Sequence, residues 1–152
     1  VMHDQMKREA SKAAASTDTG LSLHEILIMA SLIEKEAKLP EEREIISSVY
    51  HNRLKKGMKL DCDPTVRYAL KKYNRPLTFR DLECDSPYNT SRRKGLPPTP
   101  ICSPGKEAIL AAVNPASTKF LFFVAQNDGS HFFSKNLKEH LKAVDRYRRG
   151  KK

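Results

Sequence analysis

The chain has 152 residues, enough for one domain with a hydrophobic core, and 39% hydrophobic with 30% charged residues is an ordinary globular composition. This composition excludes a largely disordered chain, and neither a signal peptide nor a run of about 18 apolar residues is visible. The formal net charge of +10 indicates a polyanionic neighbour such as nucleic acid, anionic lipid or an acidic cell-wall polymer.

The first predicted elements are an N-terminal helical segment and a polar linker. Residues 2–15 have helical character, and the polar residues 16–20 would break a helix. Because the chain begins with Val1 inside this helical stretch, we expect residues 1–20 to mark the point at which a longer protein has been truncated. Residues 21–152 are expected to form the functional domain.

The most apolar predicted helix begins near Leu23 and ends with two carboxylates, Glu34 and Glu36. Ser22 and Glu25 have the spacing of a capping box, in which each side chain accepts a hydrogen bond from the backbone of the other residue. Apolar residues occupy most of the helix circumference, which is typical of a helix that is buried on most sides.

Glu36 is the candidate catalytic residue of this helix. At about 100° per residue it projects between Met29 and Leu32, whereas Glu34 lies further from the centre of the apolar stripe. Loss of hydration there would raise the pKa of Glu36 from about 4.3 toward about 6, as a general acid needs. Periodicity favours Glu36 over Glu34 without deciding between them, and an ion pair with a neighbouring lysine is the structural alternative.

A second helix is predicted over residues 40–56. A proline occupies its first position, Glu41 and Glu42 suit the positive end of the helix dipole, and Gly57 follows its last residue. Asn52 lies near the end of its apolar face, where a polar side chain could face a cleft.

A short helix and a long loop come next. Asp63, followed by a proline, is expected to be the N-cap of the short helix. Residues 85–105 contain five prolines and two glycines, which predicts a long irregular loop, and ordered loops of this length are often functional. After the loop, Ser103 and the proline that follows it are expected to cap a helix that continues to Ala112.

The C-terminal part predicts a β-hairpin and a final helix. Residues 119–125 form an aromatic and apolar strand, residues 127–130 a turn, and His131 begins the returning strand. Asn136 is positioned to cap an amphipathic helix. The predicted fold class is therefore α+β: a mainly helical single domain with a small antiparallel hairpin and a long Pro-rich loop. His131, beside a turn, is the best candidate for a site histidine.

Several common chemistries lack their sequence signals. There is no serine-hydrolase elbow, Walker loop, dinucleotide fingerprint or HExxH motif, and the five histidines form no i, i+4 pair. Three widely spaced cysteines do not fit a zinc knuckle and leave open one disulfide or three thiols. We expect no cofactor and no metal, and we interpret the basic clusters at 92–94 and 146–152 as solvated surface charge.

A set of short motifs follows along residues 23–144, each weak alone but specific as an ordered set. They are Ala30-Ser31, Glu34-Lys35-Glu36, Asn52-Arg53-Leu54, Gly57-Met58, Asp63-Pro64-Thr65-Val66, Ser86-Pro87-Tyr88-Asn89-Thr90, Gly95-Leu96-Pro97-Pro98, Pro104-Gly105, Phe123-Val124-Ala125 and Asp128-Gly129-Ser130-His131. In this order they resemble the endolytic murein transglycosylases of the MltG (YceG-like) family.

The resemblance implies a bacterial enzyme that cuts peptidoglycan glycan strands between N-acetylmuramic acid and N-acetylglucosamine and leaves a 1,6-anhydro end. It assigns the role of general acid and then base to Glu36. Ser91 and Thr99 depart from the family pattern, which affects the expected substrate groove but not the acid. The residues expected to contact substrate are Asn52, Asp63, Tyr88, Asn89, Thr90 and His131.

The resemblance also implies a location and partners. We expect a monomer at the outer face of the bacterial cytoplasmic membrane, held by an N-terminal anchor that the sequence given does not include. Peptidoglycan glycan strands are the expected substrate and peptidoglycan synthases are candidate partners, whereas no nucleic acid is expected.

Two alternatives to this function belong to other classes. Similar proteins have carried the label of a pyridoxal-phosphate lyase, but we identify neither a Schiff-base lysine nor a phosphate cradle. The other alternative is a non-catalytic basic module that binds the cell wall or nucleic acid. Such a module would not need a carboxylate within an apolar helix.

Overall fold

The computed structural model describes residues 19–149, so the helix predicted over residues 2–15 lies outside the described residues. The predicted α+β class, mainly helical with one small antiparallel sheet, is confirmed. None of the helices in the described part is long and apolar enough to cross a membrane. The elements are α2 (Leu23–Glu36), η1 (Pro40–Glu42), α3 (Arg43–Lys56), α4 (Asp63–Leu70), η2 (Asp81–Glu83), α5 (Lys106–Val113), β1 (Phe122–Ala125), β2 (His131–Ser134) and α6 (Leu137–Arg149).

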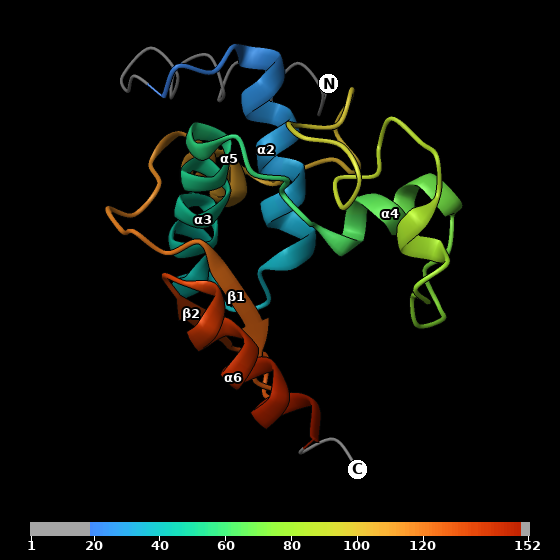
Figure 1. Cartoon of the computed structure of the whole chain (residues 1–152). Coiled ribbons are helices and arrows are strands. Elements are labelled where there is room, and N and C mark those ends of the chain that lie inside the picture. The colour runs from blue at the N-terminus through green and yellow to red at the C-terminus, as the bar shows by residue number, and fades with distance from the viewer. Residues whose placement is uncertain (1–18, 150–152) are drawn as a thin grey trace.

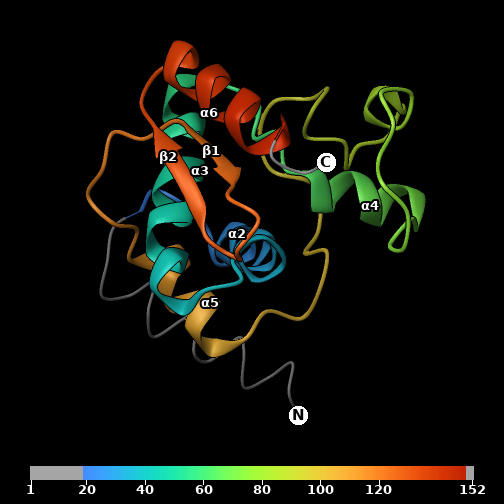
Figure 2. The same ribbon diagram turned by 90° about the horizontal axis from the view of Figure 1, so that it is seen from below.

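Helix α2 is the central element, and α3, α4 and α5 all contact it. Figure 1 shows it running through the middle of the molecule, and Figure 2 shows it end-on among the other helices. The predicted capping box is present: Ser22 Oγ accepts from the Glu25 amide (3.2 Å), and Glu25 Oε1 accepts from the Ser22 amide (3.0 Å). Residues 26–33 are all buried. This burial fixes the place of Glu36, the last residue of the helix.

The starts of three predicted helices differ in detail from the structure. The helix predicted over residues 40–56 is divided into η1 and α3, and Gly57 ends it in the left-handed region (φ 69°), as expected. Asp63 is not the N-cap of α4, because the Cys62 carbonyl already accepts the first helical hydrogen bond. Similarly, α5 begins after Gly105, whose carbonyl accepts its first helical bond, and not after Ser103.

The predicted hairpin is confirmed, although its first strand is shorter than residues 119–125. Strand β1 pairs antiparallel with β2, from Phe122 opposite Ser134 to Ala125 opposite His131. Helix α6 packs on both strands. The predicted cap is present, since Asn136 Oδ1 accepts from the Glu139 amide (2.9 Å). The pairing places His131 at the turn end of the hairpin.

The long loop has no helix or strand over residues 84–105, as predicted, and buried polar side chains order it. Asn89 is fully buried. Its Nδ2 donates to the carbonyls of Leu82 (3.0 Å) and Cys84 (2.8 Å), and its Oδ1 accepts from the Ser91 amide (3.0 Å). The side-chain amide therefore satisfies backbone groups that would otherwise be unpaired in the interior.

We predict that Asn89→Ala lowers the free energy of unfolding by about 2–4 kcal/mol, because it leaves buried backbone groups without partners. Urea denaturation measures this effect. Asn74, which is exposed, provides the matched control, and Asn74→Ala should change stability by less than about 0.5 kcal/mol. Wild-type stability in Asn89→Ala would show that this amide does not order the loop.

Candidate active site

Glu36 lies where two adjoining cavities meet. One cavity has a volume of about 370 Å³ and the other about 300 Å³. Glu36, Asp63 and Ala125 line both cavities, so these carboxylates and the end of β1 separate them. We refer to the two cavities together as the groove. A side chain at this point can reach a ligand that extends in both directions.

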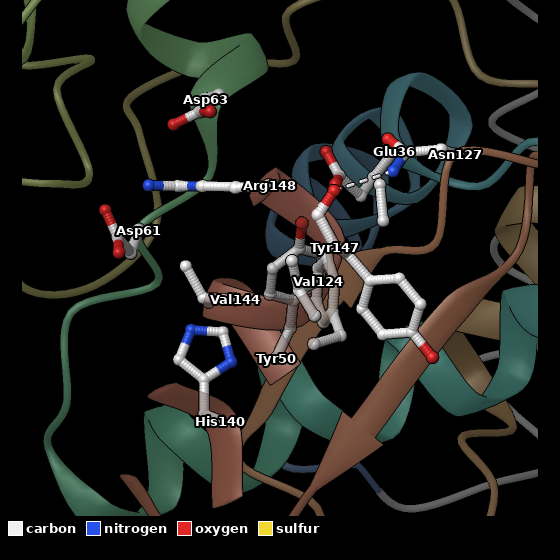
Figure 3. Close-up of a pocket in the computed structure, with 12 residues that line it drawn as sticks. Glu36, Tyr50, Asp61, Asp63, Val124, Asn127, His140, Val144, Tyr147 and Arg148 are labelled. Carbon is white, nitrogen blue, oxygen red and sulfur yellow. Dashed lines mark hydrogen bonds between the residues drawn. The ribbon is translucent and has the colours of Figure 1, made fainter. Parts of the chain in front are cut away.

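The first cavity, shown in Figure 3, lies among α2, α3, α6 and the hairpin. In this view Arg148 extends between Asp61 and Asp63. Burial and the charge of Asp61 raise the pKa of Asp63, and the Arg148 charge opposes this shift. The cavity is thus rich in charged and hydrogen-bonding groups. The residues lining only this cavity are Tyr50, Asp61, Phe123, Val124, Asn127, His140, Val144, Tyr147 and Arg148.

The second cavity is more basic and presents aromatic side chains. Tyr73 is 58% exposed, so part of its surface is accessible to a ligand. Tyrosine rings can pack on sugar rings, and the cationic groups can attract anionic substituents. The residues lining only this cavity are Lys35, Lys38, Pro64, Arg67, Tyr68, Tyr73, Ile101 and His131.

The environment of Glu36 disfavours its charged form. Its side chain is 22% exposed, and the pKa of its carboxyl group is raised from 4.5 to about 7. Burial is the largest cause, the negative charge of Asp63 adds to it, and Lys38 opposes it. The expected direction is confirmed, and the raised pKa exceeds the expected value of about 6. Asp63 contributes a charge that helical periodicity could not have placed beside Glu36.

His131 lies between the half-buried Glu36 and the buried carboxylate Glu42. Its Nε2 is 3.8 Å from Glu36 Oε1, and its Nδ1 is 2.8 Å from Glu42 Oε1. The His131 amide also donates to Glu42 Oε2 (2.8 Å). The sequence suggested Glu42 only as a favourable charge at a helix start, and no local pattern links it to a residue 89 positions away.

The structure brings together three of the predicted site residues, Glu36, Asp63 and His131. The other four do not line either cavity: Asn52, Tyr88, Asn89 and Thr90. The side chain of each of these four residues is hydrogen-bonded to another protein group. In the structure these four residues support the groove, and their contact with substrate stays a prediction.

Asn52 holds the segment that leads into β1. Its Nδ2 donates to the carbonyls of Thr118 (3.0 Å) and Phe120 (2.9 Å). This segment continues into the strand that separates the two cavities. Asn52 thus supports the groove through the backbone and does not reach into it.

Tyr88 and Thr90 hold the long loop against α4. The Tyr88 hydroxyl is hydrogen-bonded to Thr99 (2.8 Å), and its ring packs on Tyr68 with a centroid distance of 5.0 Å. Thr90 is buried, and its Oγ1 is bonded to Thr65 Oγ1 (2.9 Å) and to the Cys62 amide (2.9 Å). Tyr68 itself lines the second cavity, so the loop supports a wall of the groove.

Sequence analysis missed residues that line the first cavity. Arg148 was interpreted as part of a solvated basic tail, but α6 packs on the hairpin and brings this side chain to the cavity. Asp61 lies in the segment between α3 and α4 with positive φ (51°), and no motif indicated it. Amphipathic periodicity places α6 on a core but does not identify which element it covers.

The site offers no clear metal centre. Within residues 19–149, no group of three or more potential histidine, cysteine or carboxylate ligands lies together.

Cys62, Cys84 and Cys102 are all free thiols. Of the two alternatives that the sequence left open, one disulfide or three thiols, the structure has three thiols.

The raised pKa of Glu36 has a cost in stability that can be measured. Below pH 4.5 the carboxyl group is protonated in both the folded and unfolded states. As the pH rises to 7 the unfolded state ionises first, so the folded state loses stability. We predict that Glu36→Gln is more stable than wild type by up to about 3 kcal/mol above pH 7, with little difference below pH 4.5.

Urea denaturation at both ends of this pH range tests the prediction. Glu41→Gln, which changes an exposed carboxylate, should show no comparable pH-dependent gain. A constant difference between Glu36→Gln and wild type at all pH values would contradict a raised pKa.

Three comparisons relate this chain to known proteins. It is 48% identical over 127 residues to the endolytic murein transglycosylase of Bacillus subtilis (strain 168), covering 84% of this chain and 35% of that protein. It is 34% identical over 130 residues to the endolytic murein transglycosylase of Streptococcus pneumoniae serotype 2 (strain D39), covering 82% of this chain and 24% of that protein.

A solved structure agrees with these relatives. The crystal structure of a yceG-like protein from Listeria monocytogenes superposes with a TM-score of 0.81 and 43% identity, covering 88% of this chain and 43% of that one. The chain spans 35% of the length of the Bacillus subtilis relative and 24% of the length of the Streptococcus pneumoniae relative. The model of the YceG-like family matches residues 1–146, and on this evidence the chain belongs to the YceG-like family.

Proposed function

We propose that this chain carries the catalytic site of a lytic transglycosylase that cuts inside peptidoglycan glycan strands and leaves 1,6-anhydro ends. The observation that carries the proposal is Glu36, a carboxyl group with a pKa of about 7 between two adjoining cavities. The relatives named endolytic murein transglycosylase support the reaction class. A strand cut in its interior needs binding space on both sides of the broken bond.

Glu36 acts first as an acid and then as a base. Its proton passes to the glycosidic oxygen as the bond from C1 of N-acetylmuramic acid to that oxygen breaks through an oxocarbenium-like state. The Glu36 carboxylate then takes the proton of the C6 hydroxyl of the same sugar while O6 bonds to C1. No water enters, and Glu36 ends protonated. A pKa near 7 suits a group that must both give and take a proton at neutral pH.

The groove residues position the strand. Tyr68 and Tyr73 offer ring faces to the sugars of one side, and the cations of the second cavity attract carboxylates on the substrate. Asp63 and His131 are substrate contacts next to Glu36, and Asp63 needs no catalytic role because the sugar supplies the nucleophile.

The remaining parts of the proposal concern location and partners. Peptidoglycan lies outside the cytoplasmic membrane, so the reaction takes place at its outer face. The chain spans 35% and 24% of the two curated relatives, and a membrane anchor would lie in the part of the protein beyond the described residues. We propose a monomer that acts on strands made by peptidoglycan synthases.

Ordinary hydrolysis is the competing reaction, because Asp63 places a second carboxylate beside the same two cavities. Mass spectrometry of products released from purified sacculi distinguishes the two, since an anhydro end is one water lighter than a reducing end. A product with reducing ends that depends on Asp63 would favour hydrolysis. Strand binding with no product would leave the non-catalytic basic module.

We predict that Glu36→Gln lowers the release of anhydro products by about 10² or more, because glutamine cannot supply the proton. Glu34→Gln is the matched control. Glu34 Oε1 accepts from the Gly105 amide (2.7 Å), and glutamine keeps that acceptor, so its loss should be much smaller. Equal losses, or the reverse order, would mean that Glu36 is not the acid.

The pH dependence of activity should follow the protonation of Glu36. The protonated form starts the reaction, so we predict that kcat/KM holds below pH 7 and falls as the pH rises through about 7. In Glu36→Asp the alkaline fall should move, because the carboxyl group changes its position and surroundings. An unchanged alkaline fall would show that a group other than Glu36 controls it.

A further inference from the structure

Glu42 is a buried carboxylate that makes two hydrogen bonds to a single residue. It is only 7% exposed, and both of its oxygens bind the same residue, His131, through the ring and through the backbone amide. Glu42 is the N-cap residue of α3, but its side chain makes no capping hydrogen bond there. Burying a carboxylate is costly unless hydrogen bonds satisfy it. The structure therefore uses Glu42 to hold the first residue of β2.

The Glu42 contact fixes which nitrogen of His131 carries hydrogen. An ionised carboxylate accepts hydrogen bonds and does not donate them, so with Glu42 ionised Nδ1 is the donor in the 2.8 Å contact with Glu42 Oε1. In a neutral ring with Nδ1–H, the other nitrogen bears a lone pair. That nitrogen, Nε2, faces Glu36 Oε1 at 3.8 Å, which is longer than a hydrogen bond.

Packing keeps the ring in this orientation. Phe123 meets the His131 ring edge-on with a centroid distance of 5.3 Å, and the Phe133 ring lies 6.2 Å away. The side chain of His131 is 5% exposed, so it has little space in which to turn. The fixed orientation therefore keeps Nδ1 against Glu42 and Nε2 toward Glu36.

The tautomer matters because a hydrogen-bond donor beside a carboxyl group favours the ionised form. If Nε2 carried hydrogen, it would stabilise the Glu36 carboxylate and remove the proton that the acid must supply. An unprotonated Nε2 offers no such stabilisation.

We propose that Glu42 is a positioning residue for the reaction of Glu36: it holds the His131 ring in the Nδ1–H tautomer, so that the nitrogen facing Glu36 donates no hydrogen bond and Glu36 keeps its proton. The link to activity rests on the proposed function, whereas the tautomer does not. Glu42 itself contacts neither cavity and acts through His131.

Other charges surround the pair. Among them Asp63 favours the protonated form of Glu36 and Lys38 favours the ionised form. In the described part of the chain, the groups within ion-pair distance of the His131 ring nitrogens are Glu36 and Glu42. The further titratable or charged groups that line the two cavities are Lys35, Lys38, Tyr50, Asp61, Asp63, Arg67, Tyr68, Tyr73, His140, Tyr147 and Arg148. The buried Cys62 thiol also interacts electrostatically with Glu36.

The first test compares Glu42→Gln with Glu41→Gln, a change of the adjacent exposed carboxylate in the same short helix. The glutamine amide can donate to Nδ1, which transfers the ring hydrogen to Nε2 opposite Glu36. We expect the alkaline fall in kcat/KM to move about one pH unit lower in Glu42→Gln and to stay in place in Glu41→Gln. A loss of activity that is equal at all pH values would show a merely structural role and overturn the proposal.

The second test reads the tautomer directly in the full 152-residue chain. Long-range ¹H–¹⁵N NMR of the imidazole should show Nδ1 protonated and Nε2 unprotonated in the wild type at neutral pH. A protonated Nε2 in the wild type would overturn the proposal, even if Glu42→Gln does not fold. The expected tautomer in a protein that releases no anhydro product would instead reject the proposed function and leave the tautomer assignment intact.

Discussion

The burial of helix α2 is the constraint on which the rest of the structure depends. A helix that is apolar around most of its circumference is stable only when other segments cover it. Ser31, in its middle, shows how the cover is attached: its Oγ donates to the Ile28 carbonyl (2.7 Å) and accepts from the Ile101 amide (3.1 Å). The long loop is thereby fixed to the central helix, and the helix end that carries Glu36 is held beside the groove.

Three glutamates near this helix end have different environments and different roles. Glu34 accepts a backbone hydrogen bond from Gly105 and holds the start of α5. Both oxygens of Glu42 are satisfied by His131. The pKa of Glu36 is raised to about 7, through burial and the nearby Asp63. Residues of one type thus act as a cap, an anchor and a candidate acid because their hydrogen-bond partners differ.

The long loop contributes to the site through the scaffold. Amides and hydroxyls such as those of Asn89 and Thr90 can bind sugars or satisfy buried backbone groups, and residue type alone does not distinguish these uses. In the structure both side chains are closed off from solvent and bonded to neighbouring protein groups. The loop supports α4 and the Tyr68 ring, and so shapes one wall of the groove.

By itself the sequence determined the features that depend on neighbours a few residues apart. The capping box at Ser22, the burial of α2, the end of α3 at Gly57 and the hairpin were all predicted, because periodicity and turn chemistry are local.

Only the tertiary structure decided which distant groups meet. It brought Glu42 to His131, Asp63 to Glu36, and Arg148 from a basic tail into the first cavity. These contacts depend on how helices and strands pack against one another. Amphipathic patterns define which face of an element is buried but not which residue from another element lies against it, so the environment of Glu36 could be established only in three dimensions.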